Sequence, residues 1–268
     1  MKALSVVVIT YNEEKNIRRC IASVQQVADE IIILDSFSDD ATVQIAAEMG
    51  AIVKQSVFNG YISQKNKAIA MASNEYVLLL DADEMLGEEL AHSILEAKKN
   101  GFTCKAYNMK RCNVFLGKYI RHGLWYPDKK LRLFDKRIAI CGGYDPHDKI
   151  IMQQEVVVKL LKGDLVHHTF DNMNEYLKRN EEVSTVAARS LYNAGIRRSR
   201  LKIVFSPLWS FINGYFLRLG FLEGSKGFVI AAYTAQQSYL KYQKLRQLYR
   251  REMGETGISL TSALTNKL

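Results

Sequence analysis

Short apolar runs alternate with amphipathic segments throughout the first hundred residues, and this alternation restricts the fold more than any other feature of the chain. The apolar runs predict strands at residues 4–9, 30–36, 51–57 and 75–84. The intervening segments carry apolar residues at helical spacing, at residues 13–27, 40–50, 61–72 and 87–101. Strands and helices that alternate over such short connections indicate an α/β domain with a mainly parallel sheet flanked by helices.

The pattern changes after residue 101. Three more strands are expected, at residues 105–115, 131–140 and 154–161. The loops between them are rich in Gly, Pro, aromatic and charged residues, which suits a substrate site better than a core. The last third of the chain favours helices, at residues 172–193 and about 228–253, and then a tail.

Three acids follow the most apolar of the predicted strands, in the run Leu78-Leu79-Leu80-Asp81-Ala82-Asp83-Glu84. Ligands of open parallel sheets bind outside the carboxyl ends of the strands. Asp81 and Asp83 are two residues apart, so they point to the same side of an extended chain. Two such carboxylates can hold Mg²⁺ or Mn²⁺, with water and a diphosphate as further ligands. The alternative is a strand end followed by a solvated helix cap.

Polar residues also follow the neighbouring strands. Asp35 ends the second strand, where it can accept a hydrogen bond from a nucleobase or belong to a loop that caps the next helix. Lys65 precedes the acidic strand, where it can neutralise a diphosphate or lie on a solvated helix face. The residues after the first strand can hold a nucleoside with their amides and side chains: Thr10, Tyr11, Asn12 and Glu13.

Taken in order, the segments VVVITYNEEKNI, ILDSFSDDAT, QKNKAIAMA and LLLDADE resemble the family 2 glycosyltransferases of the GT-A fold. Weaker motifs, WYPDKKLRLF, PHD, HHTFDNMNEYLKRN and GFLEGSKGF, resemble the bacterial subgroup of lipopolysaccharide-core heptose β-1,4-glucosyltransferase-like proteins. The resemblance implies inverting, metal-dependent sugar transfer from a UDP-sugar to a lipid-linked saccharide. It also implies a GT-A catalytic domain over residues 1–170, with a nucleotide-sugar half (1–100) and an acceptor half (101–170), and a basic helical region over 171–268.

The resemblance assigns roles to the donor-site residues. Asp81, Ala82 and Asp83 match the DxD motif, with Asp83 as the direct metal ligand and Mg²⁺ or Mn²⁺ as the metal. Asp35 would read the uracil, and Lys65 would lie near the diphosphate. The nucleoside pocket would be lined by Thr10, Tyr11, Asn12 and Glu13.

Inversion requires a general base for the acceptor hydroxyl. The first candidate is Asp148 in the tripeptide PHD, where subgroup members often have His-Glu, and the second is Asp145; the alternative is a loop carboxylate with no function. The GT-A fold often supplies a late His to the metal or the diphosphate. His167 and His168 are adjacent and so point to opposite faces of a strand, and we select His168 although the sequence does not decide between them.

Three residues are candidates for binding the acceptor: Trp125, Arg132 and His147. The ring of Trp125 can stack on a sugar or belong to the core. Arg132 alternates with apolar residues, so it faces either the cleft or solvent.

The positive charge of the chain is local. Residues 1–160 contain 21 basic and 20 acidic side chains, whereas residues 161–268 contain 16 basic and 8 acidic side chains. The basic cluster Arg197, Arg198, Arg200 and Lys202 precedes an aromatic stretch too interrupted to span a bilayer, as in interfacial segments. We therefore expect peripheral binding to an anionic membrane, on the cytoplasmic face of the inner membrane. The alternative is a helical appendage with solvated charges.

Other functions fit less well. A nicotinamide dehydrogenase would carry GxGxxG after the first strand, where ITYNEE stands instead. Nucleic acid is not an expected partner, because no nucleic-acid-binding module is recognisable. The rival from another class is a non-catalytic membrane-surface or nucleic-acid-binding protein on an α/β scaffold, against which the intact acids of the DAD run argue.

Overall fold

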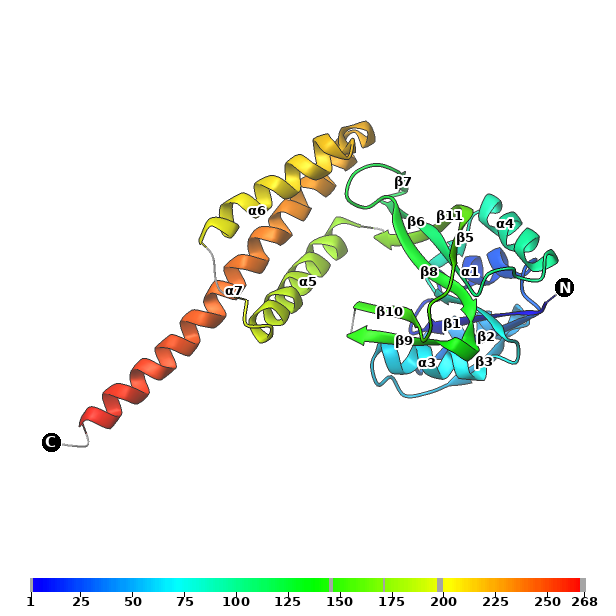
Figure 1. Cartoon of the computed structure of the whole chain (residues 1–268), viewed down its shortest axis with the longest axis horizontal. Coiled ribbons are helices and arrows are strands. Elements are labelled where there is room, and N and C mark those ends of the chain that lie inside the picture. The colour runs from blue at the N-terminus through cyan, green and yellow to red at the C-terminus, as the bar shows by residue number, and fades with distance from the viewer. Residues whose placement is uncertain (1, 145–146, 171, 197–199, 266–268) are drawn as a thin grey trace. The chain divides into compact units, whose positions relative to one another are not determined.

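The computed structural model of the chain describes residues 2–144, 147–170, 172–196 and 200–265, of which residues 144, 147, 200 and 252–265 are described by their backbone alone. The chain divides into two compact units (Figure 1). Unit 1 comprises residues 1–114 and 126–169, and unit 2 comprises residues 115–125 and 170–268. The segment 115–125 thus lies with the C-terminal helices, because its aromatic residues pack on them.

Unit 1 is built on a mixed sheet in the order β3-β2-β1-β4-β8-β6-β11-β5. The four strands of its parallel half are β1 (Leu4–Thr10), β2 (Glu30–Asp35), β3 (Ile52–Gln55) and β4 (Tyr76–Asp81). The other half is antiparallel where β4 meets β8, β8 meets β6 and β11 meets β5. These strands are β5 (Glu84–Leu86), β6 (Ala106–Phe115), β8 (Asp128–Asp135) and β11 (Val158–Phe170). The parallel half is the part that the strand–helix alternation predicts.

Both faces of the parallel half are covered at β1, β2 and β4, which explains the apolar runs of these strands, whereas the edge strand β3 is largely exposed. Val6 and Val8 pack toward α1, α2 and α4, whereas Val7 and Ile9 pack toward α3 and a small two-stranded sheet. The helices are α1 (Ile17–Val24), α2 (Thr42–Glu48), α3 (Tyr61–Met71) and α4 (Glu88–Lys99). The small sheet is an antiparallel hairpin of β9 (Ala139–Tyr144) and β10 (His147–Met152), preceded by the 3₁₀ helix η1 (Lys136–Ile138).

The last strand of the sheet differs most from the expectation. The predicted strand 154–161 is in fact β11, which starts at Val158 and continues through His167 and His168 to Phe170. The sequence places His167 and His168 on a strand, and β11 joins that strand to the predicted one. Gly163 has a φ of +84°, and a Cβ there would lie 2.3 Å from the backbone nitrogen of Leu90, so only glycine lets β11 pass the start of α4.

Unit 2 consists of helices around an aromatic cluster. The helices are α5 (Met173–Asn193), α6 (Arg200–Ile212) and α7 (Ser225–Thr265), with β7 (Lys118–Ile120), a π-helical turn η2 (Asn213–Leu217) and a 3₁₀ turn η3 (Gly220–Glu223). Phe115, Trp125, Phe170, Tyr176 and Tyr233 surround one another with ring centroids 4.9–6.3 Å apart. The α7 helix continues to Thr265, through most of the segment that the sequence suggested was a tail.

The buried carboxyl of Asp135 at the end of β8 predicts how stability depends on pH. Hydrogen bonds from Arg137 outweigh the effect of burial and, with Lys105, hold the pKa of Asp135 well below its ordinary value. Because the folded pKa lies below the unfolded pKa, this carboxyl stabilises the fold above about pH 4, by about 2 kcal/mol, and the contribution disappears as pH falls further. Chemical denaturation should show that Asp135→Asn is destabilised at pH 7 but approaches wild type near pH 2. The same loss in Asp39→Asn, which changes an exposed carboxyl, would contradict this explanation.

Candidate active site

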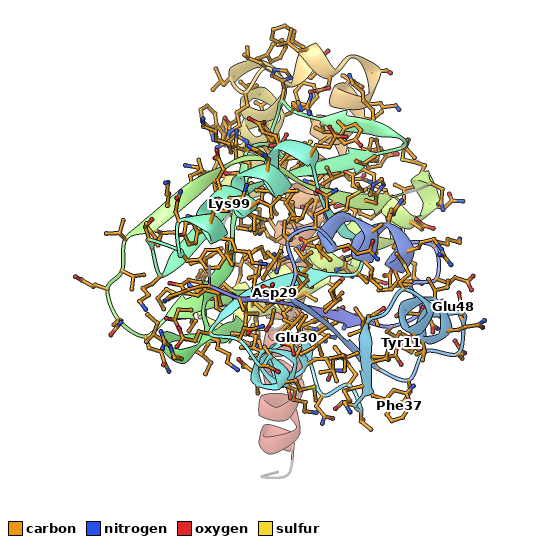
Figure 2. All side chains as sticks on the ribbon, turned by 90° about the vertical axis from the view of Figure 1, so that its right-hand side faces the viewer. Tyr11, Asp29, Glu30, Phe37, Glu48 and Lys99 are labelled. Carbon is orange, nitrogen blue, oxygen red and sulfur yellow. The ribbon has the colours of Figure 1, made fainter. Side chains whose placement is uncertain are left out.

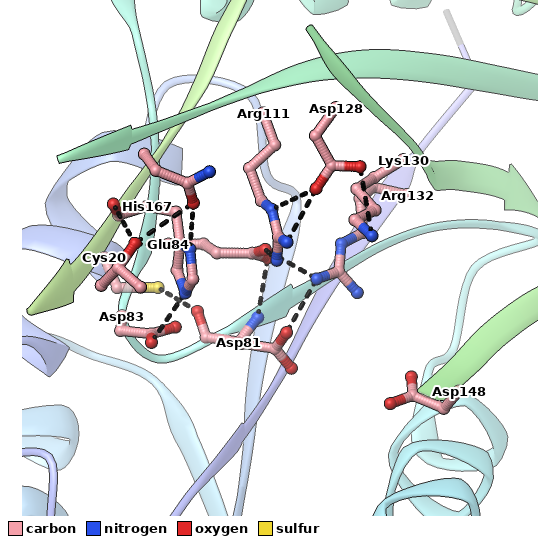
Figure 3. A network of polar contacts seen from close by, with 12 residues as sticks. Cys20, Asp81, Asp83, Glu84, Arg111, Asp128, Lys130, Arg132, Asp148 and His167 are labelled. Carbon is pink, nitrogen blue, oxygen red and sulfur yellow. Dashed lines mark hydrogen bonds and ion pairs between the residues drawn. The ribbon is translucent and has the colours of Figure 1, made fainter. Parts of the chain in front are cut away.

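The carboxylate of Asp81, at the end of β4, is held by two cations, Arg132 and Lys65, of which Figure 3 shows Arg132. Arg132 on β8 donates from Nη2 to Asp81 Oδ2 at 2.7 Å, and Lys65 Nζ on α3 lies 3.0 Å from Asp81 Oδ1. Both cations are nearly inaccessible, at 7% and 3% exposed. Burial raises the pKa of the Asp81 carboxyl, but the charges of Arg132 and Lys65 outweigh it and keep the pKa well below its ordinary value. Asp81 is therefore ionised and fixed in place.

Glu84 continues this network into the interior. It is fully buried on β5, its Oε1 accepts from Arg132 Nη2 at 2.7 Å, and its Oε2 accepts from the backbone N–H of Asp81 at 3.1 Å. Arg111 on β6 lies 3.5 Å from Glu84 and donates twice to Asp128. One carboxylate thus fixes both the backbone of the DAD turn and the guanidinium beside it (Figure 3).

Asp83 faces a histidine across the end of the sheet. Its Oδ2 lies 3.0 Å from Nε2 of His167 on β11, and Nδ1 of that ring lies 2.7 Å from Asn113 Oδ1. The amide oxygen of Asn113 accepts, so Nδ1 donates to it; the 3.0 Å contact between Nε2 and the Asp83 carboxylate then requires either a proton on Nε2 or a cation between the two atoms. His168, which we selected from the sequence, contributes its backbone N–H to the Asp83 carbonyl at 3.0 Å. The side chain that reaches Asp83 is that of His167, because neighbouring side chains on a strand point to opposite faces.

The pair of Asp83 and His167 suits a divalent metal that also binds a diphosphate. Two neighbouring ligands of an octahedral ion with bonds of about 2.1 Å are about 3 Å apart, and Nε2 and Oδ2 are separated by 3.0 Å. The Asn113 contact is the kind of outer hydrogen bond that fixes a ligating imidazole. Among the described residues no group of three or more His, Cys, Asp or Glu side chains can hold a metal. Further ligands would therefore come from diphosphate oxygens and water, as Mg²⁺ commonly uses.

Lys65 also contacts the candidate base. Its Nζ lies 2.8 Å from Oδ2 of Asp148, on β10. Burial lowers the pKa of this ammonium, but the carboxylates of Asp81 and Asp148 outweigh that effect and raise it, so Lys65 is charged. Asn66 holds the hairpin on α3 by donating to the Cys141 carbonyl at 2.8 Å and accepting from the Cys141 N–H at 2.9 Å. Asp148 is thereby brought to the edge of the sheet that carries Asp81.

The loops after β1 and β2 form a second part of this edge. The backbone N–H of Asn12 donates to Ser38 Oγ at 2.9 Å, and the N–H of Asp39 donates to Asn12 Oδ1 at 3.0 Å. Each loop presents an exposed ring, Tyr11 at 58% and Phe37 at 54%, and Figure 2 shows both rings at one margin of unit 1. Two exposed aromatic rings on linked loops offer faces on which a base can stack.

Asp35 lies beneath these loops and does not reach the surface. It is fully buried, and it accepts from the N–H and hydroxyl of Ser38 and from Gln55 Nε2 at 3.1 Å. These hydrogen bonds shape the loop that carries Phe37, and a contact of Asp35 with the uracil stays a prediction. Phe37 has a φ of +62°, a conformation that costs energy for a bulky residue and that this loop therefore enforces.

Thr10 and Glu13 lie nearer the acidic pair. Burial raises the pKa of Glu13, a hydrogen bond from Asn16 opposes this, and the nearby charge of Asp83 raises it further. Thr10 is 5% exposed, and its Oγ1 is buried without a hydrogen-bond partner among the described residues. A buried hydroxyl at the carboxyl end of β1 normally has a partner, so a ligand atom there would satisfy it.

The remaining predicted residues lie in different surroundings. Ala82 is buried between the two acids. Trp125 belongs to the aromatic cluster of unit 2, as the core interpretation predicts. Arg132 points at Asp81 and Glu84, neither to solvent nor to an open acceptor site. Asp145 and the side chain of His147 lie outside the described residues.

Three residues of this network were not predicted, Glu84, Arg111 and Asn113, and the choice between His167 and His168 was left open. Glu84 directly follows Asp83, and its position in the acidic run was a usable signal; the alternative of a helix cap does not hold for it, because α4 starts only at Glu88. Arg111 and Asn113 lie on β6. The sequence pattern predicts this strand but does not predict which residues its side chains contact.

Comparison with known proteins agrees with the resemblance seen in the sequence. The model of glycosyl transferase family 2 matches residues 5–161. An uncharacterized glycosyltransferase of Rickettsia typhi is 32% identical over 92% of this chain and 88% of that protein. The lipopolysaccharide core biosynthesis glycosyltransferase LpsC of Rhizobium meliloti is 28% identical over 89% of this chain and 93% of that protein.

Solved structures give more distant matches. Glucosyl-3-phosphoglycerate synthase of Mycobacterium tuberculosis, crystallised with Mn²⁺, UDP and its product, is 18% identical over 74% of this chain and 82% of that chain, with a TM-score of 0.49. S. aureus TarS in complex with UDP-GlcNAc is 16% identical over 93% of this chain and 92% of that chain, with a TM-score of 0.46.

Proposed function

The chain belongs to glycosyl transferase family 2, with a GT-A fold, and on this basis we propose that it transfers a sugar, with inversion, from a UDP-sugar to a lipid-linked saccharide. The reaction would require Mg²⁺ or Mn²⁺. The observation that carries the proposal is the pair of Asp83 and His167, 3.0 Å apart at the carboxyl end of the acidic strand. It lies beside Asp81, whose charge is already neutralised by Arg132 and Lys65.

Each part of the site has a role in this reaction. Tyr11 and Phe37 offer stacking faces for the uracil, and Thr10 offers a buried hydroxyl. Asp83 and His167 would hold the metal together with the diphosphate of the donor. A bound metal would stabilise the negative charge that develops on the departing UDP. Asp81 acts indirectly, because its two cations fix the turn on which Asp83 stands.

Asp148 is the base that this site supplies for the acceptor hydroxyl. It lies on β10; Asp145, which lies outside the described residues, stays the second candidate. Lys65 donates to Oδ2 of Asp148 at 2.8 Å and so orients the carboxylate, leaving the other oxygen to take the acceptor proton. Direct displacement with inversion needs this single base and stabilisation of the leaving group.

The acceptor class rests on two supports. One is the similarity to LpsC of Rhizobium meliloti, whose name places that protein in lipopolysaccharide core biosynthesis. The other is the set of C-terminal motifs in this sequence, which are similar to those of heptose β-1,4-glucosyltransferases. We therefore propose a lipopolysaccharide or lipooligosaccharide core as acceptor, glucose as donor sugar, and a peripheral location on the cytoplasmic face of the inner membrane.

Calorimetric titration with UDP tests the metal pair without requiring the acceptor. We expect wild-type protein to bind UDP more tightly with Mn²⁺ than without it, and His167→Ala to lose about 10- to 100-fold of that metal-dependent affinity. His92→Ala is the matched control, since His92 is exposed on α4. Equal UDP affinity with and without Mn²⁺ would contradict the metal role, and no UDP binding at all would favour the non-catalytic alternative.

A further inference from the structure

The α6 helix turns an apolar face outward. One stripe along the helix is formed by the residues at positions i, i+3, i+4, i+7 and i+8, which are Leu201, Val204, Phe205, Leu208 and Trp209. They are between 53% and 68% exposed. The opposite side of α6 packs on α7, where Ser206 meets Ser238 at 2.8 Å and Phe211 meets Phe228. The helix therefore buries its other side and leaves its most apolar side uncovered.

The apolar surface continues beyond the helix. The turns η2 and η3 add Phe216, Leu217, Leu219, Phe221 and Leu222, which are between 44% and 61% exposed. Single exposed apolar residues are common on protein surfaces, but a contiguous group of this kind marks a binding surface. We refer to the stripe on α6 and these turn residues together as the apolar face.

The charge around the apolar face indicates what covers it. Residues 183–251 contain twelve Lys and Arg residues but a single carboxylate, Glu223. That carboxylate is 6% exposed and is paired with Lys118 at 2.8 Å and with His122 at 2.8 Å. Glu181 and Glu182 are exposed acids of α5 just outside this stretch, and Glu181 pairs with Lys244 on α7. The stretch that contains the apolar face therefore carries a net positive charge, which Glu181 offsets in part. A second copy would meet the same positive charge and be repelled, whereas an anionic lipid surface is complementary to it.

We propose that the apolar face inserts into the interfacial layer of an anionic bilayer, with Trp209 and Phe205 among the acyl chains and the cations at the headgroups. This deepens the proposed function, since it names the surface by which the enzyme would meet a lipid-linked acceptor. Amphipathic helices with one apolar side and Lys or Arg residues around it lie parallel to the membrane plane, with the apolar side in the interfacial layer. No helix within the described residues is long and apolar enough to cross a bilayer.

Intrinsic fluorescence of the full chain distinguishes insertion from mere surface attraction. The chain has two tryptophans: Trp125, which packs in the aromatic cluster, and Trp209, which is 60% exposed. With phosphatidylcholine vesicles that contain about a third phosphatidylglycerol, we expect a blue shift and quenching by lipids brominated on their acyl chains. Trp209→Phe should show neither change. Co-sedimentation without any quenching of wild-type protein would overturn the proposal, because it would mean that the protein binds only at the headgroups.

Two substitutions on the stripe test which residues insert. We expect Phe205→Ser and Leu208→Ser each to lower partitioning into the same vesicles about tenfold. Val157→Ser is the matched control, since Val157 is 78% exposed on unit 1 and lies outside the apolar face. Unchanged partitioning in both stripe variants would overturn the proposal. So would a wild-type dimer in solution that these variants dissociate, since a second copy would then cover the face.

UDP binding separates this inference from the proposed function. Phe205→Ser and Leu208→Ser lie outside the donor site, so their UDP affinity should equal that of wild type. Loss of vesicle binding with UDP affinity intact supports the insertion face. If the wild-type protein inserts into vesicles but does not bind UDP, the result supports the membrane-binding role of the apolar face and contradicts the proposed glycosyltransferase function.

Discussion

Replacing Asp83 by alanine is expected to lower the rate of sugar transfer at least about a thousandfold. The substitution removes one of the two side chains that would hold the metal, and loss of about 4 kcal/mol of leaving-group stabilisation corresponds to that factor. Asp83 is partly exposed, and the contact of its side chain among the described residues is with His167. The fold should therefore survive, with a melting temperature close to that of wild type.

The measurement is UDP release from a UDP-sugar in the presence of acceptor, with Glu96→Gln as a control because Glu96 is an exposed carboxylate on α4. An Asp83→Ala variant that stayed as active as wild type would falsify the metal assignment. A lowered melting temperature would show that Asp83→Ala loses activity by unfolding. In that case Asp83→Asn, which preserves the shape of the side chain, tests the metal assignment instead.

Replacing Arg132 by methionine is expected to destabilise the protein by about 3–5 kcal/mol, because it leaves a buried carboxylate without its partner. Glu84 is fully buried, and Arg132 donates to it at 2.7 Å. Arg111 lies farther from Glu84, at 3.5 Å, and is already engaged by Asp128. Denaturant unfolding at pH 7 measures the change directly.

A double variant separates this charge effect from a loss of packing. Glu84→Gln removes the buried charge, so Arg132→Met combined with Glu84→Gln should recover at least about 1 kcal/mol relative to Arg132→Met alone. Two results would contradict this account. One is that the changes in unfolding free energy of the two single variants add up in the double variant, and the other is that Arg132→Met is as stable as wild type. Both variants should also lose activity, since Glu84 fixes the backbone of the DAD turn.

The parallel half of the sheet was predictable because both of its faces are buried at β1, β2 and β4. Strands such as Leu4–Thr10 and Tyr76–Asp81 consist mainly of buried apolar residues, so their presence is visible in the sequence. The end of the acidic strand was not visible, because β4 ends at Asp81 and Glu84 begins the separate strand β5. The position of Asp81 and Asp83 followed from the same pattern, because chain direction alone brings the carboxyl ends of parallel strands to one edge.

The partners of these acids were not predictable in the same way. Arg132, Arg111 and Asn113 come from antiparallel strands added later in the chain, and what they face depends on pairing register between distant segments. His167 and His168 differ by one position in β11, and one residue of register reverses which of them points at Asp83. Asp35 and Asp81 are both acids at strand ends, and only the surrounding contacts show that Asp35 shapes a loop whereas Asp81 is paired with Arg132.

The most direct test of the central claim is nucleotide release by the wild-type chain from a panel of nucleotide-sugars, with and without a truncated lipopolysaccharide core acceptor. We predict acceptor-dependent release of UDP from a UDP-sugar in Mn²⁺ or Mg²⁺, abolished by a chelator and restored by adding metal back. Release that is unaffected by chelation, or acceptor-dependent release from non-uridine donors alone, would contradict the account.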